Sequence, residues 1–321
     1  GIAVCEQMHV YKTEAQAINC ATALVRDGHK LFWPYPLPEN LYPESAHLVP
    51  PNLYRQLNAK QNLAELVPSK HLATQQHLSH SALTALSGAT PICLKAGGDA
   101  ATGWGYSVFP CRNQEELDSA RAWFAEQRES IPLVLAEEWL DIDCSWCVGL
   151  AIGETETLCF GGAEQLFSSP CKQSGSIIDP ARELPPTLEA LAIKVGEKAR
   201  QQGFRGIAGL DIGLEQSGKI IVFDPNFRIA SSSAQLLFHP AASQRAALPV
   251  SHSLQLTPDA SFADIEKTLR GPIDDGWFIP TRLFNGEKHP LSNGRHIITG
   301  FALGKDRSHA GTAVEQLRSL F

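Results

Sequence analysis

The chain has 321 residues, of which 43% are apolar and 19% are charged, and its formal net charge is −7. This length allows an ample hydrophobic core and two or three subdomains. The negative charge and the lack of any stretch rich in lysine and arginine argue against a nucleic-acid partner. No apolar run approaches the roughly 20 residues that a membrane span requires, so a membrane partner is not expected.

The cysteines and the first residues predict the compartment. Eight cysteines are scattered through apolar surroundings such as "ICLK" and "LCFGG", which is typical of reduced, buried thiols. The start, "GIAVCEQMHVYK", lacks the features of a signal peptide. We therefore expect a cytoplasmic protein. The "CSWC" segment has the spacing of a redox or zinc motif, but it lies in a strand-like run without a second Cys/His pair, which favours a core role.

Helical and extended patterns alternate in the first half of the chain. Apolar residues recur at helical spacing over 13–28, after the capping residue Thr13, and a proline-rich connector covers 34–51. Helices are predicted at "LNAKQNLAELV", "SHSALTAL" and "NQEELDSARAWFAEQ". A strand is predicted at "PICLKA", directly before the glycine-rich "GGDAATGWGY".

The second half begins with two predicted strands, "PLVLAEEWL" and "CSWCVGLAIG", and a helix, "LEALAIKVGEKARQQG". A β-hairpin that turns at "QSGK" is predicted next. Helices are expected over 261–270 and from about 308, with the strand "HIITGFALG" between them, and "GGAEQLFSSP" and "SSSAQLLFH" are expected to be loops. Alternating elements without a repeat predict an α/β or α+β class with mixed sheets.

The predicted hairpin brings two acids together. Its turn places Asp211 nearly opposite Asp224, and opposite residues have Cβ atoms roughly 4.5–5.5 Å apart. Asp224, Asn226 and Arg228 alternate along the return strand and therefore share one face. Two carboxylates repel unless a cation lies between them, and two acids with an amide suit Mg²⁺. Arg228 could then meet phosphate oxygens, whereas a solvated edge strand is the simpler alternative.

Two further segments are candidates for nucleotide binding. Lys95 ends a strand before a glycine-rich loop, whose N–H groups could converge on phosphates while the lysine supplies charge. The loop matches neither the Walker A nor the Rossmann pattern, and a flexible hairpin is an equal alternative. Glu137 and Glu138 end the next apolar strand and Asp143 follows. This edge could bind adenine and ribose, or it could carry solvated acids.

The order of these segments resembles the ATP-grasp superfamily over about residues 55–235. "IVFDPNFR" is similar to the family's terminal E-x-N-x-R strand, and "ICLKAGGDAATGWG" to its K-P-x-x-G-x-G-x-G segment. "VLAEEWLDIDCS" resembles the adenine hinge, and "LNAKQNLAEL" the helix that carries N-D-K. The resemblance implies an ATP-grasp fold with an N-terminal domain over 1–58, a central lid subdomain over 59–142 and a C-terminal subdomain over 143–321.

The resemblance also implies roles for individual residues. The nucleotide contacts that it implies are Lys60, Lys95, Gly97, Gly98, Gly103, Gly105, Glu137, Glu138, Trp139, Leu140, Asp143 and Lys172. The implied Mg²⁺ ligands are Asp211, Asp224 and Asn226, and the implied catalytic residues are Arg228 and Lys95. The family usually has glutamate at the positions of Asp143 and Asp224, so the shorter aspartate could shift the metal or the ribose contact.

The implied reaction is ATP-dependent ligation of a small-molecule carboxylate to an amine or amino acid through an acyl phosphate. The candidate substrate contacts lie after Arg228 and within 161–170, and they are Glu164, Gln165, Ser231, Ser232 and Ser233. A non-catalytic or regulatory ATP-binding protein and a kinase-like phosphoryl transferase are the alternatives on the same fold. A homodimer is allowed as the assembly.

Overall fold

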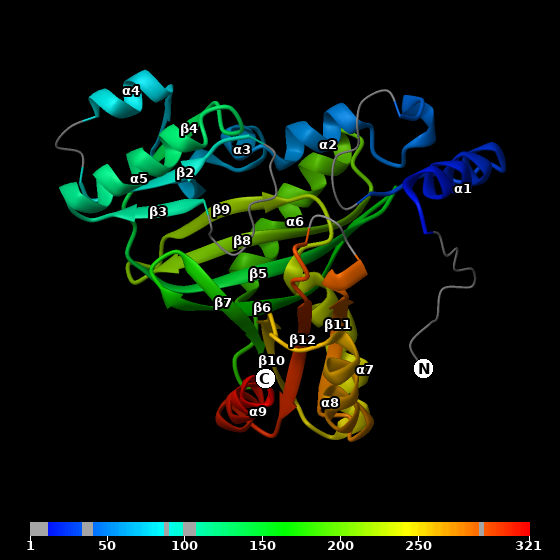
Figure 1. Ribbon diagram of the computed structural model, residues 1–321. Helices are drawn as coiled ribbons and strands as arrows, with labels where there is room; N and C mark the ends of the chain where they lie inside the picture. The colour runs from blue at the N-terminus through cyan, green and yellow to red at the C-terminus, as the bar shows by residue number, and fades with distance from the viewer. Residues whose placement is uncertain (1–11, 34–40, 87–89, 99–106, 289–291) are drawn as a thin grey trace.

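A computed structural model describes residues 12–33, 41–86, 90–98, 107–288 and 292–321. Two sheets organise these residues (Figure 1), one of four strands in the order β1-β4-β2-β3 and one of eight strands in the order β11-β12-β10-β7-β6-β5-β8-β9. The mixed helix and sheet class is confirmed. Neighbouring strands run antiparallel within both sheets, where the sequence predicted mixed sheets.

The small sheet has helices on one face and an open face toward the large sheet. Its elements are β1 (Gln75–Leu78), α4 (His80–Ala85), β2 (Ile92–Ala96), β3 (Val108–Cys111), α5 (Gln114–Glu126) and β4 (Val134–Glu138). Helix α5 begins after Asn113, whose side chain accepts a hydrogen bond from the Glu116 N–H, as the sequence predicts. Leu94, Leu117 and Phe124 pack between the sheet and α5, so the residues that alternate with Leu94 face the large sheet.

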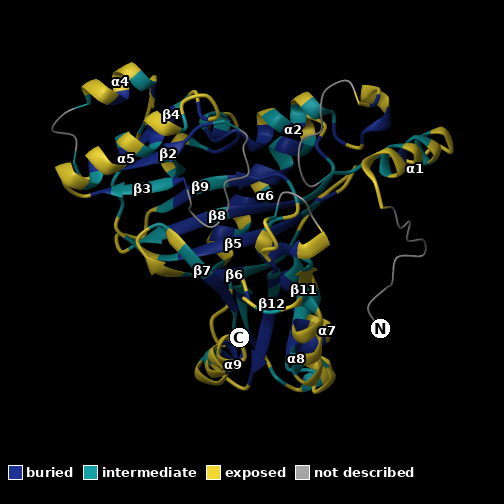
Figure 2. Ribbon diagram, viewed as in Figure 1, coloured by how far each residue is buried: buried dark blue, intermediate teal, exposed yellow. Residues whose placement is uncertain are grey.

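The large sheet forms the centre of the molecule, and its middle strands are largely buried (Figure 2). Its strands are β5 (Ile142–Ile152), β6 (Thr157–Ser169), β7 (Lys172–Ile178), β8 (Gly206–Glu215), β9 (Ile220–Asn226), β10 (Val250–Leu256), β11 (Phe278–Phe284) and β12 (Ile297–Gly304). The predicted hairpin is confirmed as β8 and β9. The "CSWC" segment lies inside β5, as predicted, and both of its cysteines are free.

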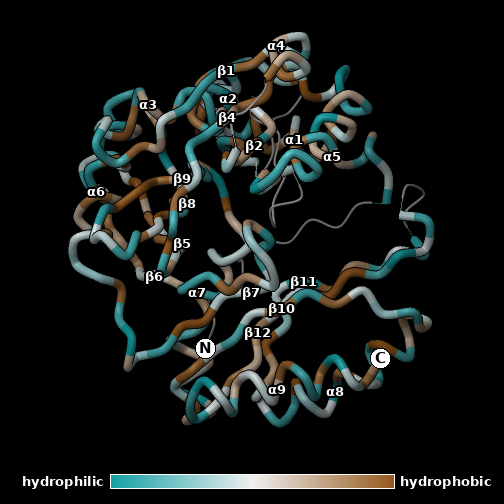
Figure 3. Tube along the Cα trace, turned by 90° about the vertical axis from the view of Figure 1, so that its left-hand side faces the viewer, coloured by the Kyte–Doolittle hydropathy of each residue, from teal (hydrophilic) through white to brown (hydrophobic). Residues whose placement is uncertain are grey.

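Helices cover both faces of the large sheet. We call the face under α6 (Pro186–Gln201) the back face and the face under α7 (Ser231–Ala246) the front face. Val148, Leu150 and Leu210 pack against α6 on the back face. Helices α8 (Phe262–Asp274) and α9 (Arg307–Ser319) lie side by side over β10 and β12 and share one hydrophobic cluster with them (Figure 3). No helix in the described parts of the chain is long and apolar enough to cross a membrane.

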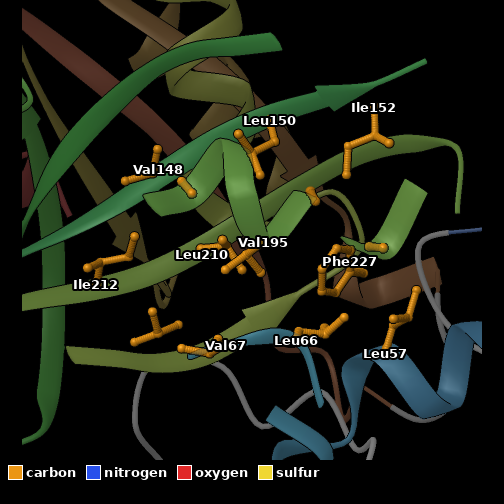
Figure 4. Packing of buried hydrophobic residues seen from close by; sticks show 14 of the residues in the cluster. Leu57, Leu66, Val67, Val148, Leu150, Ile152, Val195, Leu210, Ile212 and Phe227 are labelled. Atoms are coloured by element: carbon orange, nitrogen blue, oxygen red, sulfur yellow. The ribbon is translucent and has the colours of Figure 1, made fainter. Parts of the chain in front are cut away.

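Two of the N-terminal helices pack at the end of the β8–β9 hairpin, namely α2 (Pro51–Asn58) and α3 (Leu63–Leu66). The first helix, α1 (Glu14–Arg26), instead packs through Ala21 against Tyr42 and Ala46. Figure 4 shows Leu57 and Leu66 beside Phe227, in the cluster that also holds Val195 of α6. The predicted continuous helix over "LNAKQNLAELV" is wrong, because Ala59 is extended and a 3₁₀ turn separates α2 from α3.

Two segments that were expected to be loops are regular elements. Residues 161–169 belong to β6, which pairs with β5 on one side and with β7 on the other. Helix α7 begins at Ser231, and the Ser233 hydroxyl accepts a hydrogen bond from the Ala230 N–H at 2.9 Å. Strand pairing on both sides therefore stabilises β6, and the hydrogen bond at its first turn stabilises α7. Neither interaction can be recognised from the spacing of apolar residues within the segment.

Candidate active site

The β8–β9 hairpin places two carboxylates directly opposite each other. Asp211 pairs with Asp224 across the strands, which confirms the register predicted from the turn. The register shifts immediately beyond this pair, where Ile212 pairs with Val222. The Asn226 amide lies on the same face and its Nδ2 donates to Asp211 Oδ2 at 3.4 Å. The structure therefore brings together the three predicted metal ligands.

The front face around Asp211 disfavours a second negative charge. Burial, with a further contribution from Asp224, raises the pKa of Asp211 to about 7. Cys147 of β5 lies directly opposite Asp211, and burial followed by the Asp211 charge raises the pKa of its thiol well above the usual value. Gln165 forms a hydrogen bond with Asp211. A cation bound here would relieve the repulsion between the two carboxylates.

Lys60 is the cation that the chain supplies to this pair. Its Nζ lies 2.6 Å from Asp224 Oδ1, and its side chain is only 11% exposed. The residue predicted to contact phosphate is thus ion-paired with a predicted metal ligand. One lysine shared by two acids leaves the cluster formally negative when both acids are ionised.

Lys95 forms a second ion pair on the open face of the small sheet. Its Nζ is 2.5 Å from Glu137 Oε2, and Gln75 Nε2 donates to the other oxygen, Oε1, at 2.9 Å. Burial alone would lower the pKa of Lys95, but Glu137, with smaller contributions from Cys93 and Asp224, outweighs it and holds the pKa above its usual value. The ammonium also lies 5.5 Å from the centre of the Phe223 ring on β9. Lys95 therefore points from the small sheet toward the hairpin.

The start of the glycine-rich loop is attached to the segment after α2. The Gly98 N–H donates to Gln61 Oε1 at 2.7 Å, and the Gly98 carbonyl accepts from the Lys60 N–H at 3.3 Å. Gly98 has a φ of +93°, which a glycine adopts without strain. Gly97 donates to the Leu133 carbonyl. The predicted contacts Gly103 and Gly105 lie outside the described residues.

Arg228 is held by a residue that the sequence analysis did not single out. Its Nη1 donates to Asn58 Oδ1 at 2.7 Å. Asn58 is the last residue of α2 and is only 3% exposed. A buried asparagine at a helix end needs polar partners, but its burial depends on packing against distant elements, so no local pattern in the sequence identifies it.

The predicted adenine and ribose residues lie where the chain passes from the small sheet to the large one. Glu138 accepts a hydrogen bond from the Thr74 N–H at 3.0 Å, which lowers its pKa. Trp139 and Leu140 are half-buried between β4 and β5, and Asp143 is exposed in β5. These residues line the junction of the two sheets, as an adenine hinge would require.

Lys172 lies at the start of β7 and is exposed. The preceding residue, Cys171, forms a side-chain hydrogen bond with Cys93 of the small sheet. The tip of the β6–β7 hairpin therefore contacts the same small-sheet face that carries Lys95 and Glu137.

The five predicted substrate contacts do not share one surface. Residues paired across antiparallel strands project on the same face. Glu164 pairs with Trp146, whose side chain lies in the back-face core, so Glu164 is on the back face. Its carboxylate pairs with Arg307, at 2.5 Å, and with Arg182, at 3.0 Å. This geometry does not support contact between Glu164 and a substrate on the front face.

The remaining four predicted contacts lie on or near the front face. Gln165 accepts a hydrogen bond from the Ser145 hydroxyl at 2.5 Å, in addition to its bond with Asp211. Ser232 is buried and forms a hydrogen bond with the Cys147 thiol. Ser233 is buried and caps α7, whereas Ser231 is exposed. Of these four residues, Gln165 therefore contacts the carboxylate pair through Asp211, and Ser232 contacts Cys147, which lies opposite Asp211.

The protein-family comparison gives two matches from a single family. A model described as "L-aspartate--L-methionine ligase, ATP grasp" matches residues 68–226. A second model, "L-aspartate--L-methionine ligase N-terminal domain", matches residues 1–55. The two matches follow each other along the chain in the order that one protein of this family would have.

Solved structures share the fold at low sequence identity. N5-carboxyaminoimidazole ribonucleotide synthetase with ADP has a TM-score of 0.59 and 16% identity, covering 96% of this chain and 79% of that one. L-amino acid ligase from Bacillus licheniformis has a TM-score of 0.59 and 12% identity, with coverages of 96% and 84%. Carboxyaminoimidazole ribonucleotide synthase from Aspergillus clavatus with ATP has a TM-score of 0.56 and 16% identity, with coverages of 83% and 73%.

The family matches agree with the resemblance that the four sequence segments show. The family models describe ATP-grasp ligases, and the fold similarity extends over most of the chain. The chain belongs to the ATP-grasp superfamily and is an ATP-dependent ligase that joins a carboxylate to an amine.

Proposed function

We propose that the protein joins L-aspartate to L-methionine in an ATP- and Mg²⁺-dependent reaction. The substrate names come from the family whose two models match residues 1–55 and 68–226. The observation that carries the proposal is the Asp211–Asp224 pair. Lys60 pairs with Asp224, Lys95 points from the small sheet toward the same hairpin, and Arg228 follows the end of β9, so cations suited to phosphate come from three elements.

The donor set around this pair fits Mg²⁺. Among the described residues, no three side chains of His, Cys, Asp and Glu gather as a metal site. Asp211, Asp224 and Asn226 nevertheless offer two carboxylates and an amide oxygen, and Mg²⁺ commonly completes its shell with water and phosphate oxygens. These three residues would hold the ion, which would neutralise charge on the phosphates of ATP.

The proposed chemistry needs positioning and charge stabilisation, and it needs no protein nucleophile. A carboxylate oxygen of aspartate attacks the γ-phosphorus of ATP, and ADP leaves. The neutral amine of methionine then attacks the acyl carbon, phosphate leaves with the C–O bond electrons, and the nitrogen gives one proton to the released phosphate. Lys60 and Lys95 would orient phosphate oxygens, and Arg228 would stabilise the negative charge that develops on the transferred group.

The division into units at residues 58 and 142 belongs to the same proposal. All four strands of the small sheet fall within the expected central unit, and apart from Ile142 the large sheet falls within the expected C-terminal unit.

A cytoplasmic location is supported by the free cysteines of the described chain. A homodimer stays a prediction.

The test is product formation with purified protein, MgATP, L-aspartate and L-methionine. We expect ADP, phosphate and a dipeptide in equal amounts, detected by coupled assay and mass spectrometry, and no ADP above background when either amino acid is omitted. ADP release with aspartate alone, without a dipeptide when methionine is added, would favour the kinase-like alternative. ATP binding without turnover on a panel of amino acids would favour the non-catalytic alternative.

A further inference from the structure

We propose that Asn58 is a positioning residue whose buried amide fixes the guanidinium of Arg228 while leaving its charge free for an anion. This inference deepens the proposed function and rests on it, because Arg228 is expected to meet the phosphoryl group. Its structural basis is a set of contacts that joins the end of α2 to the end of β9.

The orientation of the Asn58 amide is determined by its neighbours. Its Nδ2 donates to the Tyr54 carbonyl at 2.8 Å and lies 3.4 Å from the Phe227 carbonyl. A carbonyl cannot donate, so these two contacts require the NH₂ group on that side of the amide. Oδ1 must then point the other way, where it accepts from Arg228 Nη1 at 2.7 Å.

Both ends of this contact are anchored in the core. Leu57 precedes Asn58 and packs in the same cluster as Phe227, which is fully buried and makes an edge-to-face contact with Phe204 at 5.1 Å. Asn58 holds the Phe227 carbonyl and the Arg228 side chain at once. The guanidinium is therefore fixed relative to the core at the end of β9.

This arrangement also fixes the arginine relative to the predicted metal ligands. The Arg228 N–H donates to the Asn226 carbonyl at 2.8 Å, so the chain turns immediately after the last ligand. A preorganised cation loses little energy to reorientation when charge develops on the substrate.

The chemical nature of the Arg228 partner differs from that of the two lysines. Lys60 and Lys95 each face a carboxylate, Asp224 and Glu137 respectively. Within the described parts of the chain, no carboxylate forms an ion pair with Arg228, and its side-chain partner is a neutral amide. A neutral acceptor orients the guanidinium without offsetting its charge, so the full charge is available to a phosphoryl group.

The test compares wild type, Asn58→Leu and Asn58→Asp, with Asn62→Ala as the matched control. Leucine keeps the volume and removes both functions of the amide. Aspartate keeps the shape and the acceptor oxygen but adds a charge. Asn62 lies in the 3₁₀ turn after α2, and within the described parts of the chain its side chain donates to the Gln56 carbonyl at 3.1 Å and does not bond to Arg228.

The first measurement is the ¹⁵N NMR signal of the Arg228 guanidinium, assigned by its loss in Arg228→Lys. We expect separate, slowly rotating Nη signals in wild type, Asn58→Asp and Asn62→Ala, and averaged signals in Asn58→Leu. This measurement needs no substrate, so it tests the positioning role even if wild type does not join aspartate to methionine. Equal signals in Asn58→Leu and wild type would overturn the proposal.

The second measurement is steady-state kinetics. We expect Asn58→Leu to lower kcat at least about tenfold while KM for ATP stays within about twofold, since the lost interaction matters mainly in the transition state. Asn58→Asp should also lower kcat, because its carboxylate offsets the arginine charge while the NMR signals stay separate. A folded Asn58→Leu protein with unchanged kcat would contradict the proposal. If Asn58→Leu does not fold, averaged signals in Asn58→Asp would contradict it.

Discussion

The two faces of the large sheet differ in how many cationic partners their acidic side chains have. On the back face, Glu164 and Asp179 share two arginines, with Arg307 bonded to both and Arg182 bonded to Glu164. On the front face, Asp211 and Asp224 share one lysine, Lys60, and burial together with mutual repulsion raises the pKa of Asp211 to about 7. Glu164, Asp211 and Asp224 lie on strands of a single sheet and Asp179 directly follows one of its strands, yet among the described residues only the front-face pair has fewer ion-pair partners than acids.

This difference distinguishes an acid that stabilises the fold from one that is available to bind a cation. An acid that is fully paired with arginine has no free charge for a ligand, and breaking the pair costs stability. Carboxylates placed together without sufficient counter-charge reduce the stability of the free protein and gain a favourable interaction when a cation arrives. Variants that remove one acid from each face therefore separate the two roles.

The largest expected effect is on the front face. Asp211→Asn keeps the shape and removes the charge, so we expect ligase activity to fall on the order of 100- to 1,000-fold, the range typical of losing one preorganised charge interaction. The melting temperature of the nucleotide-free protein should rise, because the repulsion with Asp224 is relieved. Activity assays and differential scanning calorimetry check both parts, and a variant that is both active and less stable would contradict the comparison.

A smaller effect of opposite kind is expected on the back face. Glu164→Gln should lower the free energy of unfolding by about 1–3 kcal/mol, since it leaves the partly buried Arg307 short of a partner. The kcat of the folded protein should stay within about twofold of wild type. Glu156→Gln, at an exposed position near the start of β6, is the control for charge loss alone. A fall in kcat without a loss of stability would instead assign Glu164 to the substrate site.

The third effect is on the pH dependence of stability and leaves activity aside. The pKa of Asp211 is about 7 in the folded protein and about 3.9 in an unfolded chain, so the folded state binds more protons between these values. Its contribution to stability therefore falls as pH rises from about 4 to 7. Chemical denaturation should show that Asp211→Asn gains roughly 2–3 kcal/mol over wild type between pH 5 and pH 8. A gain independent of pH would exclude Asp211 as the titrating group.

The front-face cluster could be predicted from the sequence because it depends on local geometry. A short turn fixes a hairpin register, and the register places Asp211 opposite Asp224. The sequence motifs also placed Lys95 at the end of β2, before the glycine-rich loop. Asp211 and Asp224 belong to one hairpin and Lys95 directly precedes its loop, so both relations can be predicted from a short stretch of sequence.

The face on which Glu164 lies could not be read from the sequence in the same way. It depends on the register between β6 and β5, which are joined with an irregularity at Gly149. The partners of Glu164 come from the loop after β7 and from α9, more than 100 residues away in the case of Arg307. The amide contact between Asn58 and Arg228 spans 170 residues. Contacts of this kind form only when distant elements pack, and no local pattern records them.

The point where the chain enters and leaves the small sheet has a mechanical consequence. Thr74 precedes β1 and Glu138 ends β4, and the two residues are joined by a pair of hydrogen bonds at 3.0 Å. The two ends of the small sheet are thus closed on each other at this point. Farther along the strands, the sheet is joined to the rest of the chain by Lys95 at the Phe223 ring and by Gly98, which bonds to Lys60 and Gln61. Any movement of the small sheet away from the hairpin would have to break these contacts, whereas the bonds between Thr74 and Glu138 could stay intact.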